Sequence, residues 1–264
     1  MPASLHLLTE RPRTGVLRLT INDPERRNPL SKSLFQDLEA EVRSLPADVR
    51  VVVLTGAGEE VFASGADLTE LGQAQGEGLG GGFGEAMESA QAAIEECPAP
   101  VVARIQGHCL GAGYQLALAC DLRLAQEGIK LGMPPAKLGL VYSHTGLRRF
   151  LDAIGAARTR ELFLLGRYID ASTALAWGLV NRVAPAEELD PVALELAGEL
   201  ADNAPLAQKG NKRVIAALLS AEGELQAEVE EELIELRRAS FASQDMREGM
   251  RAFAEKRRAR WRGE

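Results

Sequence analysis

Two glycine-rich turns constrain this chain more than any other feature. They span residues 62–67 (Phe-Ala-Ser-Gly-Ala-Asp) and 107–115 (Gly-His-Cys-Leu-Gly-Ala-Gly-Tyr-Gln), and each follows an apolar run and leads into a helical pattern. Glycine at such a junction adopts positive φ and lets a ligand approach the main chain closely. Two such turns side by side can aim two backbone N–H groups at one oxygen, which is the arrangement of an oxyanion hole.

Strand and helix patterns alternate over residues 16–183. Val16–Ile21, residues 51–54 and Val101–Ile105 are apolar runs of the kind found in buried strands. Helical patterns lie between them, and this alternation indicates an α/β fold.

The pattern changes after Pro185, where strand signals stop. Four amphipathic helices are expected in this part, over residues 187–201, Pro205–Ser220, 224–240 and 244–260. The sequence therefore divides into a core of residues 1–185 and a helical region of residues 186–264, and such a tail suggests a subdomain or an oligomerisation element.

Two local features lie between the glycine turns. Asp67 with Glu70 three residues later resembles a capping box at the start of a helix. Residues 72–84 are rich in glycine and poor in large side chains, so a mobile loop is expected there.

Composition excludes several classes of protein. The formal net charge of −8 argues against nucleic-acid binding, which needs a basic face. No run approaches the roughly 18 apolar residues of a membrane span, and the first ten residues do not resemble a signal peptide. We therefore expect a cytoplasmic protein with no membrane partner.

The cysteines suggest neither a disulfide framework nor a metal site. They are three in number and irregularly spaced, as is usual in a reducing compartment. His108 and Cys109 are adjacent on an expected strand and point to opposite faces, which rules out a Cys–His nucleophilic pair. Adding Cys120 gives no zinc spacing, so both cysteines are interpreted as core residues.

An ordered series of segments resembles the crotonase (enoyl-CoA hydratase/isomerase) superfamily over nearly the whole chain. The matching segments are residues 22–30, 53–56, 62–67, 107–117, 120–121, 164–167, 171–180, 247–250 and 256–257. The resemblance implies a spiral of ββα units followed by a C-terminal helical region that mediates trimer contacts, with a homotrimer or a hexamer of paired trimers as the assembly.

The resemblance also implies a substrate and a site. The substrate is an acyl-CoA thioester bound in a bent shape, and coenzyme A enters only as part of it, with no tightly bound cofactor. The oxyanion-hole donors match the backbone N–H groups of Ala66 and Ala112, beside Gly65 and Gly111. Ala112 begins a helix whose partial positive charge would add to the stabilisation of an enolate. The alternative is that the glycines only close tight turns.

The chain departs from the family's hydratases at both of their catalytic glutamates. Gln115 stands at the first position and Pro135 at the second. A neutral amide orients water or bonds substrate but takes no proton near neutral pH, and proline has no functional group. Hydration by two glutamates is therefore expected to be badly impaired or absent.

The following loop offers two other candidates for acid–base chemistry. Residues 135–139 with Tyr142 look like methylmalonyl-CoA decarboxylase, whose active-site tyrosine matches Tyr142, although that enzyme has a histidine where this chain has Ala66. His144 is by residue type better suited to proton transfer near neutral pH than a tyrosine is. Alternatively, Tyr142 forms a pocket wall and His144 is a solvent-facing residue at a helix N-terminus.

Further residues match coenzyme A contacts in the family. Arg26 and Arg27 lie near its adenine and phosphate region. Phe253 and Lys256 match positions that reach the CoA of a neighbouring subunit. The main chain of Asp67 and Leu68 is expected to line the thioester pocket.

These features favour an acyl-CoA enzyme that works through a thioester enolate. Isomerisation or decarboxylation fits the missing glutamates better than hydration. Two alternatives stay open: a hydratase that uses His144 or another carboxylate, and a non-catalytic acyl-CoA-binding protein.

Overall fold

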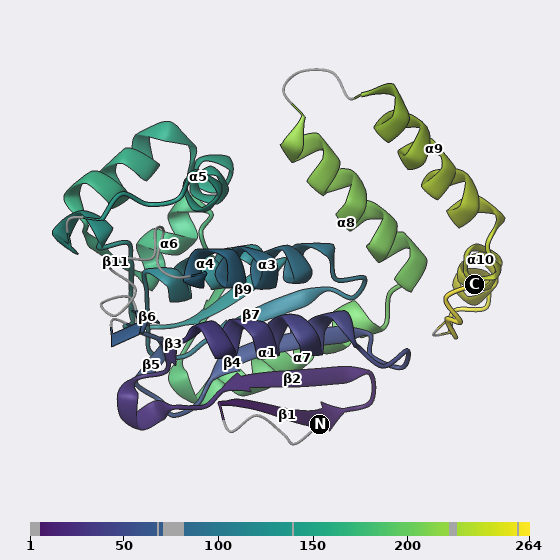
Figure 1. Cartoon of the computed structure of the whole chain (residues 1–264). Coiled ribbons are helices and arrows are strands. Elements are labelled where there is room, and N and C mark those ends of the chain that lie inside the picture. Colours follow the sequence, from purple (N-terminus) through teal and green to yellow (C-terminus); the bar gives the residue numbers. More distant parts are fainter. Residues whose placement is uncertain (1–5, 68, 71–81, 139, 222–225, 258) are drawn as a thin grey trace.

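A six-stranded sheet forms the centre of the fold (Figure 1). The computed structural model describes residues 6–67, 69–70, 82–138, 140–221, 226–257 and 259–264. The strands run in the order β1 (Leu7–Arg13), β2 (Val16–Ile21), β4 (Val51–Gly56), β7 (Val101–Ile105), β9 (Leu122–Gln126) and β12 (Arg182–Ala184). Within this sheet, β1 and β2 are antiparallel, and the other described neighbours are parallel. Every residue of β4 is buried, as its apolar sequence predicts for a central parallel strand.

Shorter strands form two further sheets. One has the order β11 (Tyr168–Asp170), β10 (Lys130–Gly132), β8 (His108–Leu110) and β5 (Val61–Ala63). The other pairs β3 (Pro29–Leu30) with β6 (Gly65–Ala66) in parallel. β5 leads into the first glycine turn and β8 into the second. Because β5 and β8 are parallel neighbours, the two turns lie at the same end of this sheet.

The chain repeats one unit: a strand of the large sheet, a strand of a small sheet, and a helix. The helices that follow are α3 (Phe83–Glu96), α4 (Ala112–Ala119) and α5 (His144–Leu165), with α1 (Lys32–Arg43) preceding them. This succession is the spiral of ββα units that was expected. α5 contains a break at Gly155, where φ is 69°.

The large sheet is covered on both faces. α1, α3 and α4 lie over one face (Figure 1). Their apolar side chains, among them Ile94 of α3 and Leu116 of α4, form the main core together with Leu54 of β4. On the opposite face, α7 (Leu189–Ala201) packs Leu196 and Ala197 against Val53 and its neighbours. The sheet is therefore the central layer of three.

The helical C-terminal region is present, as expected. It comprises α7, α8 (Pro205–Ser220), α9 (Ala227–Ala242) and α10 (Gln244–Ala254), and follows α6 (Ala171–Trp177) and β12. Short 3₁₀ turns occupy Pro24–Arg26, Pro135–Leu138 and Ala186–Glu188. In Figure 1, α8, α9 and α10 extend to one side of the large sheet. No helix among the described residues is long and apolar enough to cross a membrane.

The last predicted helix, over residues 244–260, is wrong at its C-terminal end. α10 stops at Ala254, because the chain turns at Lys256, whose φ is 51°, and folds back along α10. Two buried carboxylates hold this tail. Asp245 accepts the backbone N–H groups of Arg262 and Gly263 at 2.7 and 3.0 Å. Glu248 accepts those of the Arg257 guanidinium and the Arg260 backbone.

Candidate active site

The two glycine turns face each other. A Cβ added to Gly65, whose φ is 114°, would lie 3.2 Å from the Leu110 carbonyl oxygen and 3.7 Å from the Ala112 nitrogen. The nearest atom to a Cβ on Gly111, whose φ is 53°, would be Gly65 Cα at 3.9 Å. Both positions need glycine for backbone conformation, and a side chain at Gly65 would also press on the second turn.

The second turn is also held close to the first by Gly113. A Cβ at this position would lie 2.6 Å from Ala63 Cβ and 2.8 Å from the Ala63 carbonyl oxygen. α4 therefore packs directly on β5, the strand that leads into the first turn. Residues 63–66 and 110–113 form one compact unit.

The backbone geometry determines where the two predicted donor amides point. The Asp67 N–H donates to the Leu30 carbonyl of β3 at 2.9 Å. Successive strand amides point to opposite sides, so the Ala66 N–H points away from β3. Ala112 is the first residue of α4, and its N–H has no acceptor within the helix. The Ala66 N–H is therefore not directed at β3, and the Ala112 N–H is not used in the hydrogen bonds of α4.

Asp67 has a structural role that the sequence predicted only in part. Its carboxylate accepts the Thr69 N–H at 2.9 Å, but Glu70 accepts the Lys32 N–H at 2.8 Å instead of closing a capping box. The reason is that the Asp67 N–H is already bound to Leu30. The predicted capping box is therefore wrong in its second half. The predicted loop over residues 72–84 lies largely outside the described residues, as does Leu68.

Arg26 forms an ion pair with Asp67 beside the first turn, at 2.7 Å. Burial raises the pKa of Asp67, but the Arg26 guanidinium and the Thr69 N–H together outweigh it and lower the pKa. A cavity of about 130 Å³ adjoins this pair, lined by Asp23, Ser31 and Glu70 among others. A basic side chain thus stands near the first turn.

Of the other predicted CoA contacts, only Arg27 lies beside the first glycine turn. Arg27 is exposed, and its carbonyl accepts the Ser64 N–H at 3.1 Å, so its main chain supports the first turn. Lys256 is exposed after α10, and Phe253 belongs to α10, which Figure 1 places far from α4 and β6. Within one chain, Phe253 and Lys256 do not adjoin the glycine turns.

Gln115 is fully buried one turn after Ala112 on α4. Its Nε2 donates to Oε1 of Gln91, which is also fully buried, at 2.8 Å. Among the described residues, Gln115 Oε1 and Gln91 Nε2 have no hydrogen-bond partner. Pro135 is buried in the short 3₁₀ turn Pro135–Leu138. Neither predicted hydratase position therefore carries a titratable group.

Tyr142 is half-buried. Its hydroxyl is buried and has no hydrogen-bond partner within the described parts of the chain, and its ring packs edge-on against Phe163 with centroids 5.4 Å apart. Burial raises the pKa of Tyr142 well above its ordinary value. A Cβ on Gly146 would lie 2.7 Å from Tyr142 Cε1 and 2.9 Å from the Gln115 amide. Tyr142 and Gln115 therefore meet at the start of α5.

His144 is exposed at the first position of α5, after the N-cap Ser143, which accepts the Gly146 N–H at 3.1 Å. This agrees with the alternative interpretation, a solvent-facing residue at a helix N-terminus. The neighbouring β8 confirms another prediction, because His108 is exposed while Cys109 is buried. Burial raises the pKa of Cys109, and that of Cys120 to about 12, so both thiols stay protonated.

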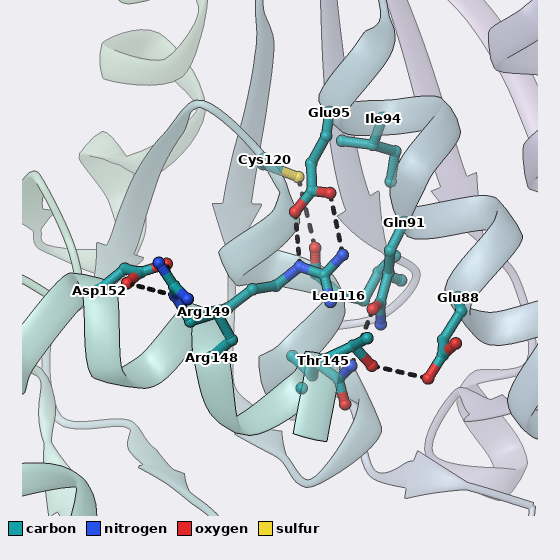
Figure 2. Close-up of polar contacts among 12 residues, drawn as sticks. Glu88, Gln91, Ile94, Glu95, Leu116, Cys120, Thr145, Arg148, Arg149 and Asp152 are labelled. Atoms are coloured by element: carbon teal, nitrogen blue, oxygen red, sulfur yellow. Dashed lines mark hydrogen bonds and ion pairs between the residues drawn. The ribbon is translucent and has the colours of Figure 1, made fainter. Parts of the chain in front are cut away.

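Sequence reasoning missed a polar face on α3. Glu88 accepts the Thr145 hydroxyl at 2.6 Å, Gln91 meets Gln115, and Glu95 binds Arg149 through two hydrogen bonds. Figure 2 shows Glu88 facing Thr145 and Glu95 facing Arg149. The signal in the sequence was the spacing of three polar residues at i, i+3 and i+7 in an otherwise largely apolar helix.

A spiral of ββα units with a helical C-terminal region defines a protein of the crotonase fold. The chain belongs to the enoyl-CoA hydratase/isomerase family, whose model matches residues 11–264. It is 34% identical to the carnitinyl-CoA dehydratase of Salmonella typhi across 100% of both chains.

Solved structures agree with this assignment. The enoyl-CoA hydratase of Bacillus anthracis matches with a TM-score of 0.91 and 32% identity, covering 98% of this chain and 100% of that one. An enoyl-CoA hydratase/carnithine racemase of Magnetospirillum magneticum matches with a TM-score of 0.92 and 30% identity, covering 99% and 97%. The predicted fold class and family are thus confirmed.

Proposed function

We propose that this protein is an acyl-CoA enzyme that stabilises a thioester enolate between the backbone N–H groups of Ala66 and Ala112. The observation that carries the proposal is the contact between Gly65 and the Leu110–Ala112 turn. The thioester oxygen would accept both N–H groups as negative charge develops on it. Each such donor typically contributes about 10²–10³ in kcat, and the N-terminus of α4 adds a partial positive charge.

Within this class we propose isomerisation or decarboxylation rather than standard hydration. A hydratase must deprotonate a water, and the two positions that would do so carry Gln115 and Pro135. Gln115 is fully buried and hydrogen-bonded to Gln91. An amide cannot accept a proton near neutral pH. The relative named carnitinyl-CoA dehydratase keeps addition or elimination of water as the second candidate, and this would need a different acid–base group.

We further propose a cytoplasmic homotrimer or a hexamer of paired trimers. Arg26 and Arg27 would contact the CoA phosphates near the first turn. Because Phe253 and Lys256 are remote from the turns of their own chain, they would reach the CoA bound to a neighbouring subunit. Coenzyme A would enter only as part of the thioester substrate, without a tightly bound cofactor.

Incubation of the protein with three thioester types in deuterated water tests the reaction. The substrates are crotonyl-CoA, a 3-enoyl-CoA and malonyl-type thioesters. Deuterium at the α-carbon, a shifted double bond or release of CO₂ would support the enolate mechanism. Tight binding of the esters without exchange or turnover would instead identify a non-catalytic acyl-CoA-binding protein.

The control for hydration is the variant Gln115→Ala. If wild type and variant hydrate crotonyl-CoA equally fast, the argument from the missing glutamates is wrong, and the protein is a hydratase with a different acid–base group.

A further inference from the structure

Glu88 belongs to a polar face that joins three helices. On α3, Glu88, Gln91 and Glu95 contact Thr145 of α5, Gln115 of α4 and Arg149 of α5, respectively. Thr145 and Arg149 are four residues apart and meet Glu88 and Glu95 in the same order. These contacts therefore follow the same N- to C-terminal order on the two helices where α5 crosses α3.

α3 and α4 run in the same direction. α3 leads into β7 and α4 leads into β9, and these two strands are parallel neighbours. The two helices therefore end side by side at the same edge of the sheet. Glu88 precedes Gln91 by three residues, just as Ala112 precedes Gln115. At 1.5 Å per residue, both lie about 4.5 Å before the contact between the two glutamines, toward the helix N-termini.

This geometry brings a carboxylate to the level of the α4 N-terminus. Glu88 is half-buried, and within the described part of the chain Thr145 is its hydrogen-bond partner. One carboxylate oxygen is thus oriented by the Thr145 hydroxyl, while the other accepts no hydrogen bond from the residues that the structure describes. A carboxylate fixed at one oxygen and open at the other is suited to proton transfer.

Other titratable groups near the turns are less suitable. The Tyr142 hydroxyl is buried and its pKa is raised by that burial. His144 is exposed at the helix start. Glu95 is held in a two-point ion pair with Arg149, with distances of 2.5 and 2.9 Å, and it lies two helical turns beyond Glu88.

We propose that Glu88 is a catalytic residue, the group that moves the proton in the enolate chemistry. This inference rests on the proposed function. The Glu88 carboxylate would take the proton from the α-carbon of the thioester, and the electrons of the broken C–H bond would form the enolate. The negative charge would then lie on the thioester oxygen between Ala66 and Ala112. In isomerisation, the carboxylic acid of Glu88 would return the proton at the γ-carbon, which regenerates the carboxylate and the neutral thioester.

Butyryl-CoA in deuterated water provides a direct test, because this saturated ester exchanges its α-protons but does not react further by isomerisation or hydration. The variant Glu88→Gln keeps an oxygen that can accept the Thr145 hydroxyl but cannot take a proton. We expect exchange to fall by about 10²-fold or more, with a Kd for butyryl-CoA within about threefold of wild type. The matched control is Glu95→Gln on the same helix face, which should exchange within about threefold of wild type.

A second variant separates chemistry from folding. Glu88→Ala should be restored in part by added formate or acetate, since a small carboxylate can supply the missing base, whereas a structural defect would not respond. Wild-type exchange in Glu88→Gln, an equal loss in Glu95→Gln, or failure of rescue would overturn the assignment of Glu88. Absence of exchange in the wild type would overturn the assignment of Glu88, and release of CO₂ from a malonyl-type thioester by the same protein would leave the proposed function standing. Absence of exchange, isomerisation and CO₂ release together would overturn the proposed function.

Discussion

Replacement of Gly113 by alanine tests whether the spacing between the two turns matters for catalysis. The added Cβ would lie 2.6 Å from Ala63 Cβ and 2.8 Å from the Ala63 carbonyl oxygen. Neither atom is the end of a flexible side chain, so relief requires α4 to move from β5. The contact must open by roughly 0.8 Å to reach ordinary van der Waals distance.

The structure suggests a larger effect on activity than on stability. Overpacking of this kind costs about 1–3 kcal/mol, and the gain from alanine in a helix offsets about 1 kcal/mol of it. Ala112 immediately precedes Gly113, so the same movement displaces its N–H from the position opposite Ala66. A misplacement near 1 Å costs about 10²-fold in rate. We expect kcat to fall by about that factor while the free energy of unfolding falls by at most about 2 kcal/mol.

Gly210→Ala is the matched control, because Gly210 lies in α8 and a Cβ there meets nothing within 4 Å. It should leave kcat unchanged and raise stability by up to about 1 kcal/mol. Denaturant unfolding and turnover on the substrate identified by the assay above measure both effects. Full activity in Gly113→Ala would refute the view that the spacing of the turns fixes the donor positions.

Two further predictions concern Tyr142 and the C-terminal tail. Tyr142→Phe removes a buried hydroxyl that has no hydrogen-bond partner among the described residues, so the free protein should keep or slightly gain thermal stability. If this hydroxyl donates a hydrogen bond to the reacting thioester while Glu88 moves the proton, turnover should fall more than substrate binding. Unchanged kinetics would make Tyr142 only a wall of the pocket. Glu248→Gln should release the tail at neutral pH, because the Arg257 and Arg251 side chains and the Arg260 N–H donate to the carboxylate and lower its pKa. That contribution is present above pH 4.5, the ordinary pKa, and is lost as the pH falls further. Fluorescence of Trp261, which packs on Gly249, in a Trp177→Phe background should report both changes, and a signal insensitive to acid and to Glu248→Gln would contradict this role.

The strands and turns were predictable because their residues have strong local preferences. The strand predicted over residues 51–54 lies within β4. β4 extends two residues further, because Thr55 and Gly56 also pair with β2. Gly65 and Gly111 both have positive φ. In each case the local sequence has only one good conformation, so no knowledge of distant residues was needed.

Other features depend on contacts between distant segments. The capping box failed because Leu30, far from Asp67 in the chain, occupies the Asp67 N–H. α10 ends early because Asp245 and Glu248 bind residues of the returning tail. Spacing along the chain does not reveal such partners.

The polar face of α3 illustrates the same limit within the site. The spacing of Glu88, Gln91 and Glu95 is visible in the sequence, and a solvated helix face was an equally good interpretation. Only the shared direction of α3 and α4, which precede the parallel neighbours β7 and β9, brings Glu88 level with Ala112. The exposure of His144 likewise follows from how α5 begins and not from the residue type.

The donors proposed at the two turns are main-chain groups, and this affects which substitutions such a protein tolerates. Substitutions at Ala66 or Ala112 alter a side chain but leave the amide hydrogen in place, unless proline is introduced. If these amides stabilise a negative oxygen, most point mutations would leave that capacity intact, whereas the groups that move protons are side chains and could be replaced one at a time. A lineage built on these two turns could then lose one reaction and acquire another while it keeps the proposed oxyanion hole.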